Sequence, residues 1–154
     1  MVKNSDLVAE FLKKQKIEIV FGIIGSANSY IFDSIVKLGY TKIICTHHEQ
    51  SAVMAMGAYF RASGKLSASI VTAGAGSSNA ITGVLSNWAD SIPGLIISGQ
   101  EQAKYLETHK DLRMYGIQGY DSPEAVKKIT KYAKTLTMTD SVQEELEKGL
   151  TISI

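Results

Sequence analysis

Two kinds of hydrophobic pattern alternate along the chain. In the first, apolar residues recur at the spacing of one face of a helix. This pattern occurs near residues 7–12, 31–36, 49–63, 78–88, 123–131 and 141–150. The second is a nearly continuous apolar run, typical of a buried strand, and it occurs at residues 17–24, 43–45, 66–72 and 94–98. Strands that alternate with helices predict an α/β fold, with a parallel sheet of about five or six strands and helices on both faces.

The length of the chain and its least regular segment set the expected organisation. The 154 residues are enough for one compact domain with a substantial core and too few for two ordinary domains, so we treat residues 1–154 as a single domain. Residues 101–120 have poor periodicity and many polar side chains, which predicts a surface loop. Loops of this length in compact domains are often functional.

Charge and cysteine content exclude several classes of function. The chain has 16 Lys and Arg residues against 15 Asp and Glu residues, so it lacks the basic excess of a nucleic-acid or membrane-binding protein. Cys45 is the single cysteine, which excludes an intrachain disulfide and a cysteine-based zinc site. No stretch approaches the ~18 to 20 apolar residues of a membrane span, and the N-terminus has no signal-peptide run. We therefore expect a cytoplasmic protein without nucleic-acid or membrane partners.

A carboxylate marks the junction between one predicted strand and the next helix. Glu49 follows the run at 43–45 and begins the helix at 49–63, where a carboxylate is favoured by the helix dipole and can accept free backbone N–H groups. For an arbitrary glutamate this structural role is much commoner than a catalytic one. His47 and His48 are adjacent, so their side chains diverge and they are poor partners for one metal, although either could donate a proton to a substrate.

Residues 72–79, with the sequence TAGAGSSN, form a second candidate site at a strand-to-helix turn. The glycines in this turn could let a ligand approach the backbone near helix N–H groups. Asn79 occupies the place of the third glycine in a G-x-G-x-x-G fingerprint, and no phosphate-loop Gly-Lys-Ser/Thr follows. Glycine chemistry alone therefore favours a tight turn between packed elements.

Taken in order, several segments resemble the acetolactate-synthase-like branch of the thiamine-diphosphate-dependent enzymes. Residues 21–26 are similar to F-G-I-P-G-G, and residues 48–65 to H-E-Q-x-A-x-x-A-x-x-Y-x-R-x-x-G-K. Residues 71–83 resemble V-T-S-G-P-G-x-T-N-x-x-T-G, residues 90–100 resemble D-S-I-P followed by a strand and G-Q, and residues 131–132 fall where that branch has T-K-Y. The resemblance spans almost the whole chain and implies the N-terminal pyrimidine domain of the thiamine-diphosphate-binding fold.

The resemblance assigns roles to five residues. It implies that Glu49 hydrogen-bonds N1′ of the cofactor's aminopyrimidine, because a proton shared there favours the tautomer whose N4′ can accept the proton from C2 of the thiazolium ring. It places Gly25, Ala75 and Asn79 along the pyrimidine pocket as cofactor-binding residues. It also places Gln118 at the substrate end of the site as a catalytic residue. No metal ligand is implied within this chain.

Three positions depart from the family pattern. Ile24 and Ala75 stand where the family has prolines, and Gly119 stands where it has an acidic residue after the glutamine. The loss of two prolines removes backbone preorganisation from turns that border the cofactor. These departures leave the substrate class open, whereas Glu49 is retained.

In this family a separate C-terminal domain carrying G-D-G holds the diphosphate and Mg²⁺, and no Gly-Asp-Gly occurs in the 154 residues. The resemblance thus implies a fragment of a 2-oxo acid carboligase or decarboxylase, a transferase or lyase, and the fragment is expected to be inactive alone. Its half site would be completed across a subunit interface of a homodimer or tetramer. A subunit of a split decarboxylase and a catalytically silent binding module of the same fold are the alternatives. Residues 106–118 are also similar to enzymes of surface-sugar pathways.

Overall fold

The computed structural model describes residues 2–108 and 111–154, without the side chains of residues 107 and 108. Its sheet consists of β1 (Ile19–Gly22), β2 (Lys42–Cys45), β3 (Ala68–Val71) and β4 (Leu95–Ser98). All pairings are parallel and the order is β2-β1-β3-β4. The predicted α/β fold with a parallel sheet is confirmed, but the described chain has four strands instead of five or six. Each strand corresponds to one of the apolar runs, and the chain after residue 126 follows an irregular path until the last helix.

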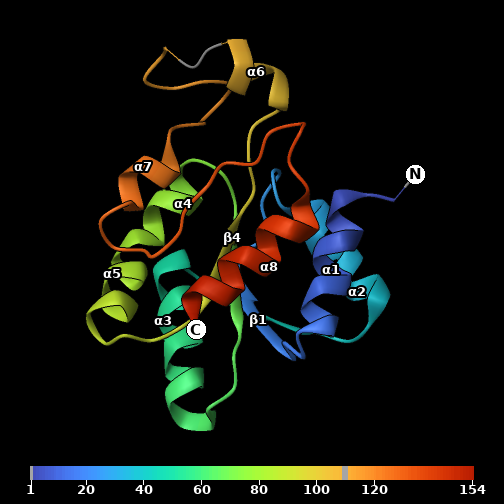
Figure 1. Ribbon diagram of the computed structural model, residues 1–154, viewed down its shortest axis with the longest axis vertical. Helices are drawn as coiled ribbons and strands as arrows, with labels where there is room; N and C mark the ends of the chain where they lie inside the picture. The colour runs from blue at the N-terminus through green and yellow to red at the C-terminus, as the bar shows by residue number, and fades with distance from the viewer. Residues whose placement is uncertain (1, 109–110) are drawn as a thin grey trace.

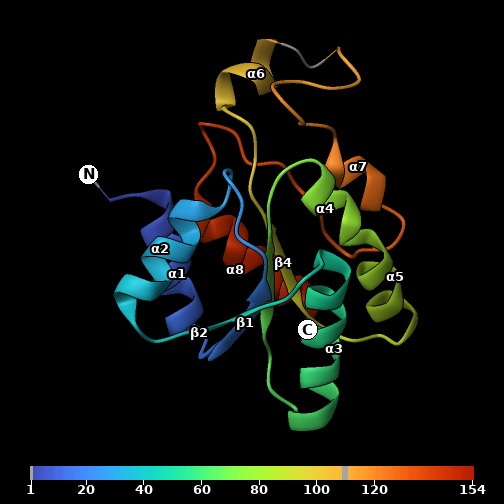
Figure 2. The ribbon, with the colours of Figure 1, turned by 180° about the vertical axis from the view of Figure 1, so that it is seen from behind.

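Helices cover both faces of the sheet, as the sequence predicts (Figures 1 and 2). One face carries α1 (Asn4–Lys14), α2 (Ser29–Leu38) and α8 (Val142–Ser153). The other face carries α3 (Glu49–Ser63) and α5 (Ile81–Ala89), preceded by the short helix α4 (Ala75–Asn79). The helices α6 (Ala103–Thr108) and α7 (Ser122–Val126) belong to the chain that follows β4.

Alternation along the central strands divides the core into two clusters. Val20 in β1 and Ile70 in β3 pack against α1, α2 and α8, whereas Phe21 and Val71, one position later, pack against α3 and α5. This is the period of two that a strand requires, because successive side chains point to opposite faces. Burial on both faces explains why these strands are almost wholly apolar.

The connections between the strands define where a ligand can bind. The connection from β1 to β2 passes over one face through α2, and the connection from β3 to β4 passes over the other through α4 and α5. The order of the sheet therefore reverses between β1 and β3. In open parallel sheets ligands bind at such a switch point, outside the carboxyl ends of the strands. The turns that follow β1 and β3 lie at this position.

Three predicted boundaries are corrected by the structure. The helix expected at 78–88 is two helices, which meet at Ala80, and the helix expected at 123–131 ends at Val126. The expected loop at 101–120 contains α6, and its residues 109–110 lie outside the described ranges. Gly64 ends α3 with a φ of 68°, as expected for a left-handed C-terminal glycine.

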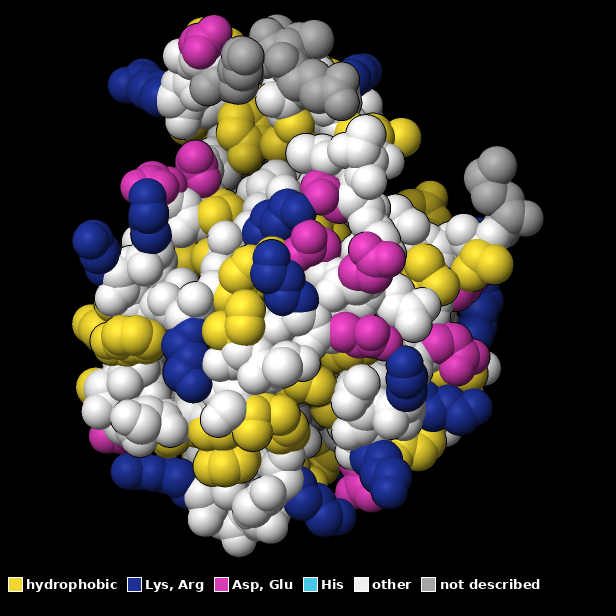
Figure 3. Space-filling model, viewed as in Figure 1, with side chains coloured by type: hydrophobic (Ala, Val, Ile, Leu, Met, Phe, Trp, Pro, Cys, Tyr) yellow, Lys and Arg dark blue, Asp and Glu magenta, His cyan; other side chains and the backbone are white. Residues whose placement is uncertain are grey.

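Two further observations concern the charges on the surface and the length of the helices. Lys and Arg side chains are interspersed with Asp and Glu side chains over the face shown in Figure 3. Within residues 2–108 and 111–154, no helix has the length and apolar character that a membrane crossing requires.

Candidate functional site

The turn after β1 is held by a buried asparagine. The backbone N–H of Gly25 donates to Asn28 Oδ1 at 2.7 Å, and Asn28 Nδ2 donates to the carbonyl oxygen of Ile23 at 3.0 Å. Asn28 is only 1% exposed. Sequence reasoning missed this residue, although an asparagine directly before a helix is a recognisable N-cap signal. Here the side chain turns back to the preceding turn instead of capping α2.

Thr72 joins the turn after β1 to the turn after β3. A Cβ added to Gly25 would lie 2.6 Å from both Cβ and Oγ1 of Thr72. A Cβ added to Gly76 would lie 2.6 Å from Cγ2 of the same threonine. Only glycine fits at either position, because real Cβ atoms do not approach other atoms so closely. In the sequence, Thr72 stands out only as the first residue of the turn at 72–79.

Glu49 lies in the first turn of α3 with its carboxylate directed to a neighbouring helix. His48 is the N-cap residue of α3, and its Nδ1 accepts the backbone N–H of Gln50 at 3.2 Å. Glu49 is only 8% exposed, and its Oε2 accepts a hydrogen bond from Nδ2 of Asn79 at 3.0 Å. His48 therefore caps the N-terminus of α3, so Glu49 is not needed for that structural role. The carboxylate of Glu49 is instead paired with Asn79 of α4.

The second oxygen of Glu49 faces the glycine-rich turn. The described residues supply no hydrogen bond to Oε1, and a Cβ added to Gly76 would lie 3.2 Å from this oxygen. The absence of a side chain at Gly76 thus keeps space beside a buried carboxylate. An unused acceptor of this kind fits a protonated nitrogen of a heteroaromatic ring, which can donate to it.

Gln118 reaches the same edge of the sheet from the chain after β4. A Cβ added to Gly74, whose φ is 65°, would lie 2.6 Å from Cγ and the carbonyl oxygen of Gln118. The backbone N–H of Gln118 donates to Glu101 Oε1 at 3.1 Å. Ala75, the residue after Gly74, is exposed at the start of α4. The structure thus assembles the residues predicted from the sequence, which are Gly25, Glu49, Ala75, Asn79 and Gln118.

The departures from the family pattern have different structural settings. Ile24 is 59% exposed, so this position places an apolar side chain on the surface. A Cβ added to Gly119 would lie 2.5 Å from Cδ2 and Cε2 of Tyr115, so this arrangement has no room for an acidic side chain there. Burial raises the pKa of Tyr115, whose hydroxyl donates to the carbonyl oxygen of Tyr120 at 2.8 Å.

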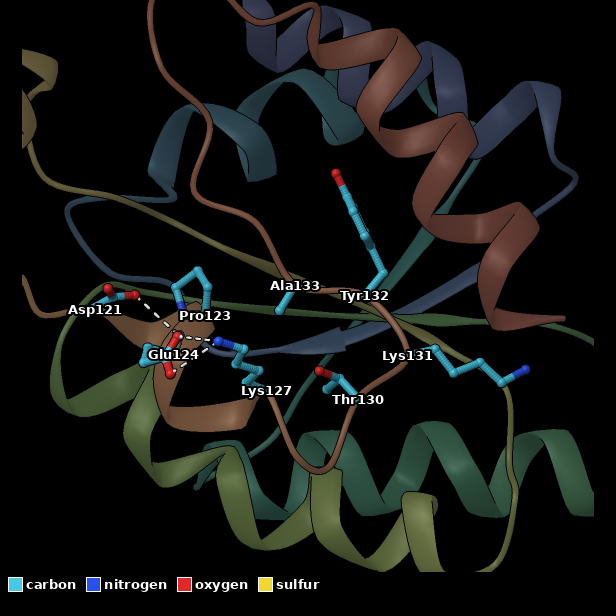
Figure 4. Close-up of a pocket in the computed structure, with 8 residues that line it drawn as sticks. All are labelled: Asp121, Pro123, Glu124, Lys127, Thr130, Lys131, Tyr132 and Ala133. Atoms are coloured by element: carbon cyan, nitrogen blue, oxygen red, sulfur yellow. Dashed lines mark hydrogen bonds and ion pairs between the residues drawn. The ribbon is translucent and has the colours of Figure 1, made fainter.

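Two hollows lie away from Glu49. The smaller, of about 420 Å³, lies between α7 and residues 130–133 (Figure 4), and the ammonium of Lys127 is paired there with Glu124 at 3.2 Å. The larger, of about 780 Å³, follows the exposed edge of β4, and its lining includes Gln100 and Glu101. Neither is lined by Gly25, Glu49, Ala75, Asn79 or Gln118. The predicted site is therefore the open edge between the β1 and β3 turns.

Comparison with known proteins agrees with this geometry. Residues 2–126 match the family described as "Thiamine pyrophosphate enzyme, N-terminal TPP binding domain", in which thiamine pyrophosphate is another name for thiamine diphosphate.

Several acetolactate synthases are similar to most of the chain. The acetolactate synthase large subunit of Haemophilus influenzae is 31% identical over 154 residues, which are 99% of this chain and 26% of that protein. The isozyme 3 large subunit of Escherichia coli is 28% identical over 151 residues, or 97% of this chain and 25% of that protein. The chloroplastic acetolactate synthase of Arabidopsis thaliana is 27% identical over 147 residues, or 96% of this chain and 21% of that protein. The chain thus spans about a quarter of the length of these curated relatives, and it belongs to the N-terminal TPP-binding domain family of the thiamine pyrophosphate enzymes.

Proposed function

We propose that this chain provides the pyrimidine half of a thiamine-diphosphate site in an acetolactate-synthase-like enzyme that acts on 2-oxo acids. The observation that carries the proposal is the buried carboxylate of Glu49, which is held by Asn79 and keeps Oε1 unpaired at the switch point of the sheet. Similarity to acetolactate synthases over almost the whole chain supports the reaction class. The enzyme would be a transferase or lyase.

In this proposal each residue has a distinct task. Glu49 holds a proton between Oε1 and N1′ of the pyrimidine, while Asn79 fixes the other oxygen so that the carboxylate cannot rotate away. When bound, thiamine diphosphate supplies a nucleophilic carbon and an electron sink for decarboxylation. The burial of Glu49 strengthens its hydrogen bonds because the local dielectric is low.

The turns supply shape and a further polar group. Gly25 and Ala75 border the pyrimidine without side chains that would fill its place, and Gly76 leaves room beside Oε1. Gln118, which rests on Gly74, presents an amide at the substrate end and can orient a 2-oxo acid by hydrogen bonds. This is the role that the family pattern assigns to it.

The site is completed by polypeptide beyond these 154 residues. We propose that another domain holds the diphosphate and Mg²⁺, and that the two halves meet at an interface between subunits of a homo-oligomer. Exposed apolar side chains around the site support such a cover, since Ile117 is 90% exposed, Ile24 59% and Met54 38%. The exposed thiol of Cys45 suits a reducing cytoplasm. In the following experiments, the complete enzyme means this chain together with the polypeptide that holds the diphosphate.

Replacement of Glu49 by glutamine tests the proposed function. Glu49→Gln retains shape and hydrogen bonding but cannot supply the acidic proton, so exchange of the C2 proton of bound thiamine diphosphate should slow by about 10²- to 10⁴-fold. The dissociation constant of the cofactor should change much less. Isotope exchange into C2, followed by NMR in the complete enzyme, measures the rate, and Glu10→Gln on the exposed side of α1 is the matched control.

Three results would contradict parts of the proposal. Equal exchange rates in the wild-type enzyme and Glu49→Gln would remove the catalytic role of Glu49. A wild-type complete enzyme that binds thiamine diphosphate without C2 exchange would identify a silent binding module. Tight binding of thiamine diphosphate by the 154 residues alone would contradict the half site.

A further inference from the structure

We propose that Thr72 is a positioning residue, a spacer whose branched side chain sets the separation of the turns after β1 and β3 and thereby the place of Gly76 beside Glu49. The structural part of this inference stands on the contacts of Thr72 alone. Its catalytic consequence rests on the proposed function.

The side chain of Thr72 lies against both turns. A Cβ added to Gly25 would lie 2.6 Å from Cβ and Oγ1 of Thr72 and 2.8 Å from its methyl carbon Cγ2. A Cβ added to Gly76 would lie 2.6 Å from the same Cγ2. The methyl group of one β-branched side chain therefore lies against both turns. A β-branched residue is stiff about χ1, so it can hold such a separation.

The hydroxyl of Thr72 indicates that shape is what this side chain contributes. Oγ1 is buried and, within the described residues, has no hydrogen-bond partner. A buried hydroxyl without a partner is unfavourable, and it cannot be holding either turn by a hydrogen bond. Valine has the same branched outline without this hydroxyl. Valine should therefore perform the spacing as well as threonine does.

The contacts connect Thr72 to the carboxylate that the proposed reaction uses. Asn28 locks Gly25 on one side of Thr72, through the bond from the Gly25 N–H to Asn28 Oδ1 at 2.7 Å. On the other side Gly76 lies between the Thr72 methyl group and Oε1 of Glu49. Loss of the methyl group would let the turn after β3 approach the turn after β1. The space beside Oε1 would then change although Glu49 itself is intact.

Two substitutions separate shape from hydrogen bonding. Thr72→Ser keeps the hydroxyl and removes the methyl group, whereas Thr72→Val keeps the branched shape and removes the hydroxyl. In the complete enzyme without cofactor, hydrogen exchange of the amides of Gly25 and Asn28 should become about tenfold faster in Thr72→Ser, because local opening of the turn becomes easier. In Thr72→Val the exchange should stay within about twofold of the wild-type rate. Mass spectrometry of a peptide covering residues 23–32 measures this.

The loaded enzyme gives a second readout. Thr72→Ser should lower the rate of C2 proton exchange about tenfold, while the dissociation constant of thiamine diphosphate changes less than about threefold, because small misplacement affects the reacting geometry more than binding. Thr72→Val should restore the wild-type rate to within about twofold. This rescue by an isosteric variant is not expected of a residue that acts through its hydroxyl.

The outcomes separate this inference from the proposed function. Wild-type behaviour of Thr72→Ser in both measurements would overturn the spacer role. Equal losses in Thr72→Ser and Thr72→Val would also overturn it, since the hydroxyl would then be the required group. If Glu49→Gln leaves C2 exchange unchanged, the proposed function fails, and the hydrogen-exchange comparison still decides whether Thr72 spaces the turns.

Discussion

The two parts of the molecule that meet at the site are held in different ways. Residues 4–99, here called the sheet region, are joined by strand pairing and by two buried apolar clusters. The described part of residues 100–154, here called the C-terminal region, adds Leu146 and Leu150 of α8 to one cluster, and its partly buried Ile129 packs against the other. Between α6 and α7 the C-terminal region also attaches to the sheet region through polar side chains, as where Ser77 Oγ donates to the hydroxyl of Tyr120 at 3.2 Å.

This difference separates two properties of the site. The sheet region provides Glu49, which is buried at the start of α3, and Asn79, which donates a hydrogen bond to it. The C-terminal region provides Gln118, whose position depends on hydrogen bonds and on a glycine contact. We expect the pyrimidine side to be rigid and the substrate side to be adjustable, because polar tethers at a surface open more readily than buried strands.

The largest expected change is in the free energy of unfolding, when a glycine in each region is replaced by alanine. In Gly22→Ala the new Cβ would lie 2.2 Å from the backbone oxygen of Ile70, so the β1–β3 pairing must move, and we expect a loss of about 3 kcal/mol in the free energy of unfolding. In Gly149→Ala the nearest atom, in Tyr132, is 3.6 Å away, and the helix should gain about 0.5 to 1 kcal/mol. Urea unfolding measures both. Similar losses in the two variants would mean that the regions are packed alike.

The second prediction concerns a substitution that disrupts the contact between Gly74 in the sheet region and Gln118 in the C-terminal region. Gly74→Ala places a Cβ 2.6 Å from Gln118 at a φ of 65°, and should cost about 2 kcal/mol. Gly64→Ala is the control, because its φ is 68° but no atom lies within 4 Å of the added Cβ. Hydrogen exchange across the Tyr115–Gly119 bridge should accelerate in Gly74→Ala alone. Acceleration in both variants would show that a general loss of stability, rather than loss of the Gly74–Gln118 contact, opens residues 115–119.

The third prediction tests the hydrogen bonds by which Asn28 holds the turn after β1 in the sheet region. Asn28→Ala leaves the N–H of Gly25 and the carbonyl of Ile23 without their partner, which should cost about 1.5 kcal/mol. Ser29→Ala removes a bond of 3.2 Å from an exposed hydroxyl to Ser26 and should cost less than about 0.5 kcal/mol. Thermal unfolding of the two variants provides the measurement. Equal shifts would indicate that Asn28 acts only through its local turn.

The smallest effect is a pH dependence in the C-terminal region. The ammonium of Lys134 lies 2.6 Å from Asp140 and 2.7 Å from Glu145, and it lowers the pKa of Asp140 to about 2 and that of Glu145 below its ordinary value. A carboxyl group whose pKa is lowered on folding stabilises the protein above its ordinary pKa. That contribution is lost as the pH falls toward about 2.

Lys134→Met should therefore lower the unfolding midpoint slightly at neutral pH, and this difference should shrink as the pH falls toward about 2, where Asp140 becomes protonated in the wild type. Lys65→Met removes a more exposed pair with Glu18, in the sheet region, and should change the midpoint even less. Denaturation curves at a series of pH values measure both. A difference for Lys134→Met that persists undiminished at low pH would show that Lys134 does not act through its ion pairs with these carboxylates.

The alternation of apolar residues predicted most of the fold, because burial imposes a local period on each element. Each predicted strand is present, and the helix at 49–63 has the expected bounds. The number of strands was overestimated, since pairing of a further segment with β4 depends on contacts between distant residues. The chain between α7 and α8 instead follows an irregular path, and the ion pair of Lys134 with Asp140 helps to hold it.

The candidate site shows the same division between sequence and tertiary structure. The motifs around Glu49 and the 72–79 turn indicate the family from the sequence, and the family match over residues 2–126 shows it. Only the tertiary structure determines that Asn79 pairs with Glu49 from thirty positions away, and that His48 caps the helix in its place. It alone places Thr72 between two glycines and Gln118 on Gly74, because these contacts depend on the crossing of chains, which has no local pattern.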